Sequence, residues 1–182
     1  MRYLARSVTT AVVLGVGLSV AACSIDVHEH PSGRDKDVDI RTPLGDMSLS
    51  STAVPDTGLP VYPGAQPFRE RDEDGNANVR IDSWLFDLDV AAAKFRTPAR
   101  PEQVVEFYRG EMATLGEVVE CRGEIDFKGR DGHQHAVCDP EFMERDTQLV
   151  VGTGNNHRMV VVTPRSGGAQ FSIVRINTHP QH

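Results

Sequence analysis

The sequence predicts an α+β fold, in which an antiparallel β-meander is covered on one face by a single main α-helix. The first observation behind this prediction is that Val104, Tyr108 and Met112 recur at helical spacing after Pro101, a residue suited to a first helical turn, and that Gly116 can end the helix. The second is a succession of strand-like segments after the helix, separated by turns rich in glycine and asparagine. These segments are residues 118–127, 133–138, 148–153, 158–163 and 169–177.

The chain before the helix also shows extended patterns. Residues 59–65 (LPVYPGA) contain two prolines, so we expect an extended segment along the sheet or the helix, with Val61 and Tyr62 as its anchors. Residues 78–88 read as a strand, and residues 91–97 continue extended. Residues 37–51 read as a short hairpin, and their pattern recurs in residues 78–92 at a spacing of 41 residues. This similarity is either an internal repeat or a chance likeness between alternating strands.

Composition excludes several classes of protein. Of the 182 residues, 39% are hydrophobic and 25% are charged, which is typical of one ordinary globular domain rather than a fibre or a wholly disordered chain. The formal net charge of −7 offers no broad basic surface to a phosphate backbone, so no nucleic-acid partner is expected.

The N-terminus has the pattern of a secretory signal. Arg2 and Arg6 precede an uncharged apolar run over residues 8–20, which ends in two alanines. A retained transmembrane anchor is the alternative, but the run falls short of the ~20 residues that a spanning helix needs.

The residues at the end of this signal, Val20, Ala21, Ala22 and Cys23, resemble the lipobox of bacterial lipoproteins. That resemblance implies cleavage before Cys23 and acylation of this cysteine, for example with palmitate, which would anchor the mature protein to a membrane. It also implies a place in the cell envelope, either facing the periplasm or in the outer membrane. Ser24, where an Asp would indicate inner-membrane retention, favours the outer membrane.

Three regions follow from these patterns. Residues 1–22 are expected to be the lipoprotein signal peptide, and residues 23–58 to hold the lipidated cysteine, a polar tether up to about residue 36 and the short hairpin. Residues 59–178 are expected to form the globular α+β domain.

The two remaining cysteines, Cys121 and Cys138, form an even pair in an oxidising compartment, so we predict a disulfide. A hairpin that pairs Phe127 with His133 would place the two cysteines nearly opposite each other. A redox-active or metal-binding pair is the alternative, but the C-x-x-C spacing is missing.

Histidines supply the one metal-site hypothesis. His133 and His135 lie two residues apart in a predicted strand, so their side chains would face the same way, and His157 or Asp131 could add a ligand. The alternative is that both are exposed polar residues beside a turn.

Short motifs in the middle of the chain resemble a group of uncharacterised bacterial envelope lipoproteins. The resemblance rests on LPVYPGA (residues 59–65), KFRT (94–97), VVEFYR (104–109) and FSIV (171–174), and it covers roughly residues 37–177. It implies a fold and a location but no catalytic residues. Arg100 stands where these relatives tend to have a serine, and it is a poor N-cap for the helix.

The motif search therefore favours a non-catalytic function. No Walker loop, nucleophile elbow, Rossmann fingerprint or zinc-protease motif occurs in the sequence. We expect a lipid-anchored envelope protein that binds or assembles with another envelope component, either a protein or a glycan, without a cofactor. The alternatives are a periplasmic metal-binding protein that uses His133 and His135, and an enzyme whose site is dispersed over the fold.

Overall fold

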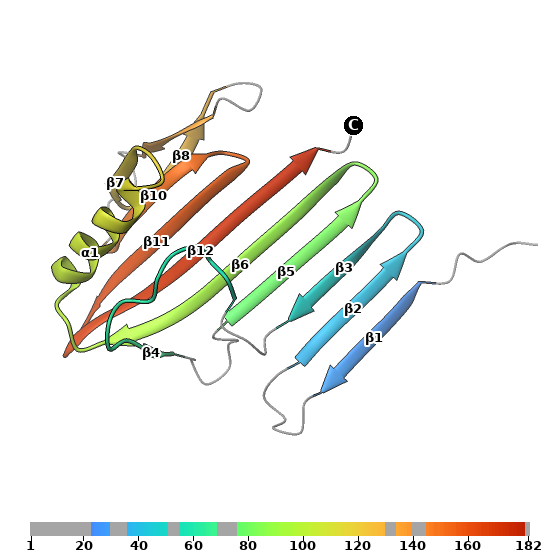
Figure 1. Ribbon diagram of the computed structural model, residues 1–182, viewed down its shortest axis with the longest axis horizontal. Coiled ribbons are helices and arrows are strands. Elements are labelled where there is room, and N and C mark those ends of the chain that lie inside the picture. Colours follow the sequence, from blue (N-terminus) through green and yellow to red (C-terminus); the bar gives the residue numbers. More distant parts are fainter. Residues whose placement is uncertain are drawn as a thin grey trace, which may run out of the picture.

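One broad antiparallel sheet dominates the computed structural model, which describes residues 23–29, 36–50, 55–68, 76–129, 134–139 and 145–180 (Figure 1). From edge to edge its strands follow the order β1-β2-β3-β5-β6-β12-β11-β10-β7, and the short β4 pairs with β6. A separate pair, β8 and β9, forms a two-stranded sheet, and one helix, α1, lies against β10 and β11. The predicted fold class is therefore confirmed.

The described strands and the helix have the following bounds: β1 Ser24–Glu29, β2 Lys36–Thr42, β3 Gly45–Ser50, β4 Gln66–Pro67, β5 Asn76–Ser83, β6 Phe86–Thr97, α1 Pro101–Ala113, β7 Val118–Arg122, β8 Ile125–Lys128, β9 His135–Cys138, β10 Thr147–Thr153, β11 Asn156–Arg165 and β12 Gly168–Pro180.

Helix α1 buries its apolar stripe against the sheet. Val104, Tyr108 and Met112 are fully enclosed, as their spacing predicted, while Glu106 and Arg109 are exposed. The stripe meets side chains that alternate along β6, β10, β11 and β12. These core residues are Ala93, Phe95, Leu149, Val151, Val160, Val162, Ala169, Phe171 and Ile173.

The start of α1 is capped without a side-chain acceptor at the N-cap position. Arg100 cannot accept a hydrogen bond through its guanidinium, as expected from the sequence. Instead, Gln103 Oε1 accepts the Arg100 N–H at 3.1 Å, and Thr97 Oγ1 accepts the Ala99 N–H at 3.3 Å. Neighbouring side chains thus satisfy backbone donors just before the first turn.

The proline-rich segment over residues 59–65 runs along the helix side of the sheet. Tyr62 packs edge-on against Phe107, with ring centroids 5.2 Å apart, and also contacts Phe171. The predicted anchor Tyr62 is confirmed, but Val61 is exposed and its prediction is wrong. Adjacent residues of an extended chain point to opposite sides, so Val61 and Tyr62 cannot both face the core. Leu59 packs against the core as well.

Tyr108 connects this segment to the helix. Its hydroxyl donates to the Pro60 carbonyl at 3.2 Å and accepts the Tyr62 N–H at 3.1 Å. Burial raises the pKa of Tyr108, so the phenol stays protonated and able to donate. Two backbone groups of the segment therefore depend on one buried side chain.

Residues 78–97 contain a turn that the sequence analysis missed. The chain reverses between β5 and β6, where Ser83 Oγ accepts the N–H groups of Leu85 and Phe86 and donates to the Phe86 carbonyl at 2.7 Å. The serine side chain makes this turn without glycine or proline, which are the usual signals. The predicted continuous strand over residues 78–88 is therefore wrong.

The predicted hairpin over residues 37–51 is confirmed as β2 and β3, and its turn uses the same chemistry. Thr42 Oγ1 donates to the Gly45 carbonyl at 2.8 Å and accepts the Leu44 N–H. The 41-residue spacing places Thr42 on Ser83, so the two similar stretches fold into equivalent hairpins. They lie side by side because β3 pairs with β5 (Figure 1).

The structure differs from the expected tether at its beginning. Residues 24–29 form β1, which pairs with β2, although the side chains of residues 24–28 are exposed. Strands β1 to β3 belong to the same sheet as the later strands, across the boundary expected after residue 58. The signal peptide over residues 1–22 lies outside the described residues.

We predict that Tyr108→Phe lowers the free energy of unfolding by about 1–3 kcal/mol, because the Pro60 carbonyl and the Tyr62 N–H lose their partner. Urea denaturation measures the change. Arg109→Ala, which removes an exposed ion pair with Glu120, serves as the control and should cost less than about 1 kcal/mol. Equal losses in the two variants would contradict this account of Tyr108.

Candidate functional site

The predicted metal ligands are not brought together among the described residues. His133 and Asp131 lie outside these residues, and His135 is exposed on β9. His157 is buried on β11, where its Nδ1–H donates to the Thr153 carbonyl at 3.1 Å. In the part of the chain that the structure describes, no three His, Cys, Asp or Glu side chains are placed to hold a metal ion.

His157 instead has a packing role. Its ring lies against Phe127 of β8, with centroids 4.6 Å apart. Burial lowers the pKa of His157, so the neutral ring is the form that fits this contact. A neutral, enclosed ring helps to fasten the β8–β9 pair to the sheet.

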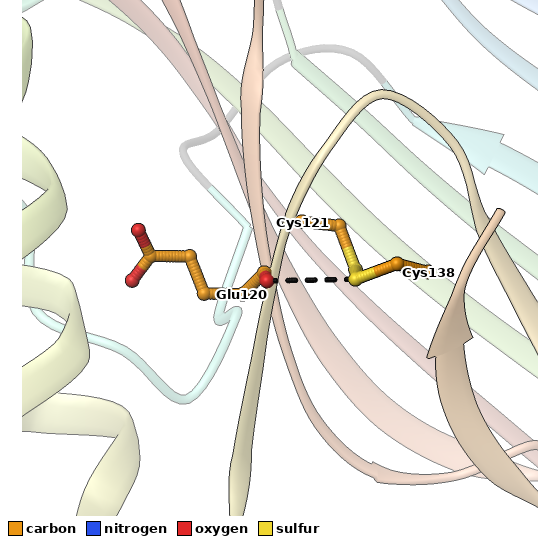
Figure 2. The surroundings of a disulfide bond; sticks show 3 residues. All are labelled: Glu120, Cys121 and Cys138. Carbon is orange, nitrogen blue, oxygen red and sulfur yellow. Dashed lines mark hydrogen bonds between the residues drawn. A yellow bond between two sulfur atoms is a disulfide. The ribbon is translucent and has the colours of Figure 1, made fainter. Parts of the chain in front are cut away.

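The predicted disulfide between Cys121 and Cys138 is present and joins β7 to β9, with the two Cα atoms 5.4 Å apart (Figure 2). Cys138 Sγ also lies 3.5 Å from the Glu120 carbonyl oxygen. A disulfide sulfur carries no proton, so this approach is a close contact rather than a hydrogen bond.

The geometry behind the disulfide differs from the predicted hairpin. The expected strand over residues 118–127 breaks at Gly123 into β7 and β8, and Phe127 pairs with Ala136 instead of His133. Cys138 pairs with Ile125 within the small sheet. The disulfide therefore links two sheets and does not cross-link one hairpin.

The β8–β9 pair covers one end of the sheet on the face opposite α1. Cys121 pairs with Gln148 of β10, on the opposite side of the strand from Glu120, which bonds to Arg109 of the helix. Val150 has the same orientation as Cys121 and is fully buried. Gly154 N–H donates to the Gln134 carbonyl and ties the pair to the β10–β11 turn.

A second apolar surface lies on that same face, on strands β2, β3, β5 and β6, far from β7 and β10 in the strand order. Val90 points away from the helix, because it is separated by an odd number of strand positions from Phe95, which faces α1. Directly opposed residues of neighbouring strands share a face, so the register carries this orientation through β5, β3 and β2.

Two apolar rows result, and we call them together the apolar face. Each row crosses β2, β3, β5 and β6, and its side chains are half-buried by their neighbours within the sheet. Ile25 and Val27 of β1 extend the rows and are exposed. The rows are Ile40, Met47, Ile81 and Leu88, and Val38, Leu49, Val79 and Val90, the second continued by Ile176 of β12.

No described element covers the apolar face. Helix α1 contacts β7, β10, β11 and β12, and the β8–β9 pair contacts β7 and β10. Figure 1 shows β1, β2, β3 and β5 as a single layer beside the part of the sheet that carries the helix. A contiguous apolar surface that other elements leave uncovered typically marks an interaction site.

The opposite side of these strands is polar. Asp89 accepts hydrogen bonds from Arg80 at 3.0 Å and from Arg175 at 2.8 Å. Burial alone would raise the pKa of Asp89, but the hydrogen bonds and charges of the two arginines hold it below its ordinary value. The apolar side of the sheet thus changes from the helix side to the opposite side between the two halves of the molecule.

A pocket of about 590 Å³ lies where β4, β6 and the β11–β12 turn meet. The Arg96 guanidinium is 5.8 Å from the centre of the Phe68 ring, and Arg165 Nε donates to Gln170 Oε1 at 3.1 Å. No Asp or Glu is found among the described residues that line it. Two arginines held by neutral partners give this pocket a chemistry suited to an anionic group.

The apolar face was not predicted from the sequence, although its alternating apolar residues are visible in residues 37–51 and 78–92. Alternation shows that a strand has an apolar side but does not say whether the helix covers that side. The arginine pocket left no sequence signal, because its residues come from three separate segments.

We expect the stability of the protein to decrease as the pH falls below about 6.5, the ordinary pKa of His157 in the unfolded chain. The lowered pKa of the folded state means that the unfolded chain binds this proton first. Urea denaturation at about pH 7.5 and about pH 5.5 measures the effect. His157→Asn removes the titration and keeps an amide donor at the position of Nδ1 for Thr153, so this variant should lose less stability than the wild type over that range.

The double substitution Cys121→Ala and Cys138→Ala should lower the free energy of unfolding by about 3 kcal/mol. The disulfide closes a loop between cysteines 17 residues apart, and its loss lets the unfolded chain gain conformational entropy. Non-reducing peptide mapping of the purified protein provides the direct check and should find the two cysteines joined. Two free thiols would contradict the disulfide.

Comparison with known proteins finds no match for this chain, either among protein-family models or among curated proteins and solved structures. The resemblance to envelope lipoproteins therefore stays a prediction. Within the described residues, no helix has the length and apolar character needed to cross a membrane.

Proposed function

We propose that this protein is a lipid-anchored bacterial envelope protein, held through acylated Cys23, that binds an envelope protein through its apolar face and has no catalytic role. The observation that carries the proposal is the apolar face itself. Its two rows cross four strands and have no described element over them. Burying such a surface against a partner yields about 25 cal/mol per Å² of apolar area removed from water.

The chemistry of the apolar face favours a protein partner over a glycan. Its rows consist of Val, Ile, Leu and Met, with no aromatic ring and no hydrogen-bonding side chain. A sugar placed there would lose water from its hydroxyl groups without regaining hydrogen bonds. An apolar strand or helix of another protein meets no such cost.

The position of Cys23 supports the anchor. It is exposed, is not part of the disulfide, and directly precedes β1. Acyl chains attached there contribute about 0.8 kcal/mol for each buried CH₂ group, and two or more chains hold a protein stably on a membrane. The apolar face would then be presented close to the membrane surface.

The experiment that tests this function combines fractionation with crosslinking inside living cells. Mass spectrometry should find acyl chains on Cys23, and Cys23→Ala should move the protein out of the membrane fraction. A photoreactive benzophenone amino acid in place of Met47 should give a crosslinked product of defined mass. The same amino acid in place of Ser48, the next residue on the opposite side of β3, is the matched control and should give none.

A second variant separates binding from folding. Ile81→Asp places a charge in the middle of the apolar face and should abolish the Met47 crosslink while the protein still folds, as a cooperative urea transition shows. Equal crosslinking from the Met47 and Ser48 positions would contradict the proposed binding surface. Turnover of an envelope substrate by the purified soluble protein would contradict a non-catalytic role.

A further inference from the structure

Large apolar side chains gather at the tips of the two equivalent hairpins. Leu44 at the β2–β3 turn and Trp84 at the β5–β6 turn are each 69% exposed, and Leu85 is 55% exposed. The hydrogen bonds of Thr42 and Ser83 hold the backbone of these turns in place. We call Pro43, Leu44, Trp84 and Leu85 the hairpin tips.

Both hairpin tips lie at the same end of the sheet as the proposed anchor. Ser24, the residue after Cys23, pairs with Arg41 one position before the first turn, and Gly45 after that turn pairs with Ser83 of the second. Figure 1 shows the beginning of β1 and the two turns at the same ends of neighbouring strands. With strands about 4.8 Å apart, Cys23 and both tips fall within roughly 20 Å of one another.

This arrangement places the tips where a bilayer would be. Acyl chains on Cys23 would enter the membrane at these strand ends, so the side chains beside Cys23 are the first to reach the membrane surface. Tryptophan is enriched at membrane interfaces because its ring is apolar and its indole N–H can still hydrogen-bond. Leucine adds apolar area at the same depth.

Charge near the tips selects the kind of lipid. Asp46 and Asp82 are exposed and stand directly opposite each other, one residue behind the two turns. They line a hollow of about 420 Å³ together with Asp87, Leu44 and Trp84. Three carboxylates outnumber the single guanidinium of Arg41, which stands opposite Asp46 on β2, so the charge around the hollow is net negative. An anionic headgroup would be repelled there, whereas the ammonium group of a zwitterionic lipid would meet carboxylates and the face of an indole ring.

We infer that the hairpin tips insert into the interface of a zwitterionic bilayer and fix the orientation of the protein on the membrane that holds Cys23. This inference rests on the proposed function, because the acyl anchor supplies the membrane. It adds a second contact, which stops the sheet from rotating freely about a single anchored residue.

Trp84 is the only tryptophan of the chain, so its fluorescence reports on this site alone. The test uses the mature chain, residues 23–182, without natural acylation, coupled through the free thiol of Cys23 to a maleimide lipid in phosphatidylcholine and phosphatidylethanolamine vesicles. Brominated acyl chains in these vesicles should quench most of the Trp84 emission and shift the remainder to shorter wavelength. Persistent unquenched emission from vesicle-bound protein would overturn the inference.

Two further comparisons sharpen the test. Leu44→Asp should reduce the quenching, whereas Leu115→Asp, which changes an exposed leucine after α1, should leave it unchanged. Replacing part of the zwitterionic lipid by an anionic lipid should weaken the quenching, and stronger quenching would contradict the role assigned to the aspartates around the hollow.

Failure of the inference and failure of the proposed function are distinguishable. The synthetic anchor brings the tips to a bilayer whether or not cells acylate Cys23. A Cys23 peptide from cells without acyl chains would therefore overturn the proposed function and leave the fluorescence result valid. Acylated Cys23 together with unquenched Trp84 would overturn the tip contact alone.

Discussion

One helix cannot cover a sheet of this width, and much of the structure follows from that constraint. Helix α1 has 13 residues and is about 20 Å long. Nine strands side by side span about 40 Å at a spacing of about 4.8 Å. The helix therefore covers only the part of one face that β7, β10, β11 and β12 supply, and the remaining surface is either closed by other elements or left open.

The covered half is closed from both sides. On the helix side, Tyr108 binds the proline-rich segment through its hydroxyl, and Tyr62 and Phe107 pack together over the core. On the opposite side, the disulfide and the contact between Phe127 and His157 hold the β8–β9 pair over β7 and β10. Each cover is therefore held by a specific polar or covalent link in addition to packing.

In the open half, the apolar side of the sheet is the side that faces away from the helix. Its polar side, with Asp89 between Arg80 and Arg175, continues the face that carries the helix, while its apolar side turns away from the helix. β6 contains the change, since Leu88 and Val90 face one way and Ala93 and Phe95 face the other. In the proposed function, the half of the sheet that the helix covers provides stability and the open half provides the binding surface.

The sequence by itself determined the elements that depend on local pattern. The spacing of Val104, Tyr108 and Met112 predicted the buried side of α1, and alternation with glycine and asparagine turns predicted the strands after it. The even number of remaining cysteines led to the disulfide between Cys121 and Cys138. These predictions succeeded because helical and strand periods act over a few residues, and a disulfide requires only two thiols that meet and an oxidant to accept their electrons.

Only the tertiary structure decided which surfaces are covered and which residues meet. The break at Gly123, the register that pairs Phe127 with Ala136, and the burial of His157 depend on contacts between distant strands. The turn at Trp84 depends on hydrogen bonds of the Ser83 side chain, and serine also occurs within strands, so its presence did not predict a turn. The apolar face and the hairpin tips could not be predicted from alternation. Alternating residues show that a strand has one apolar side, but only the pairing of the strands shows whether that side faces the helix.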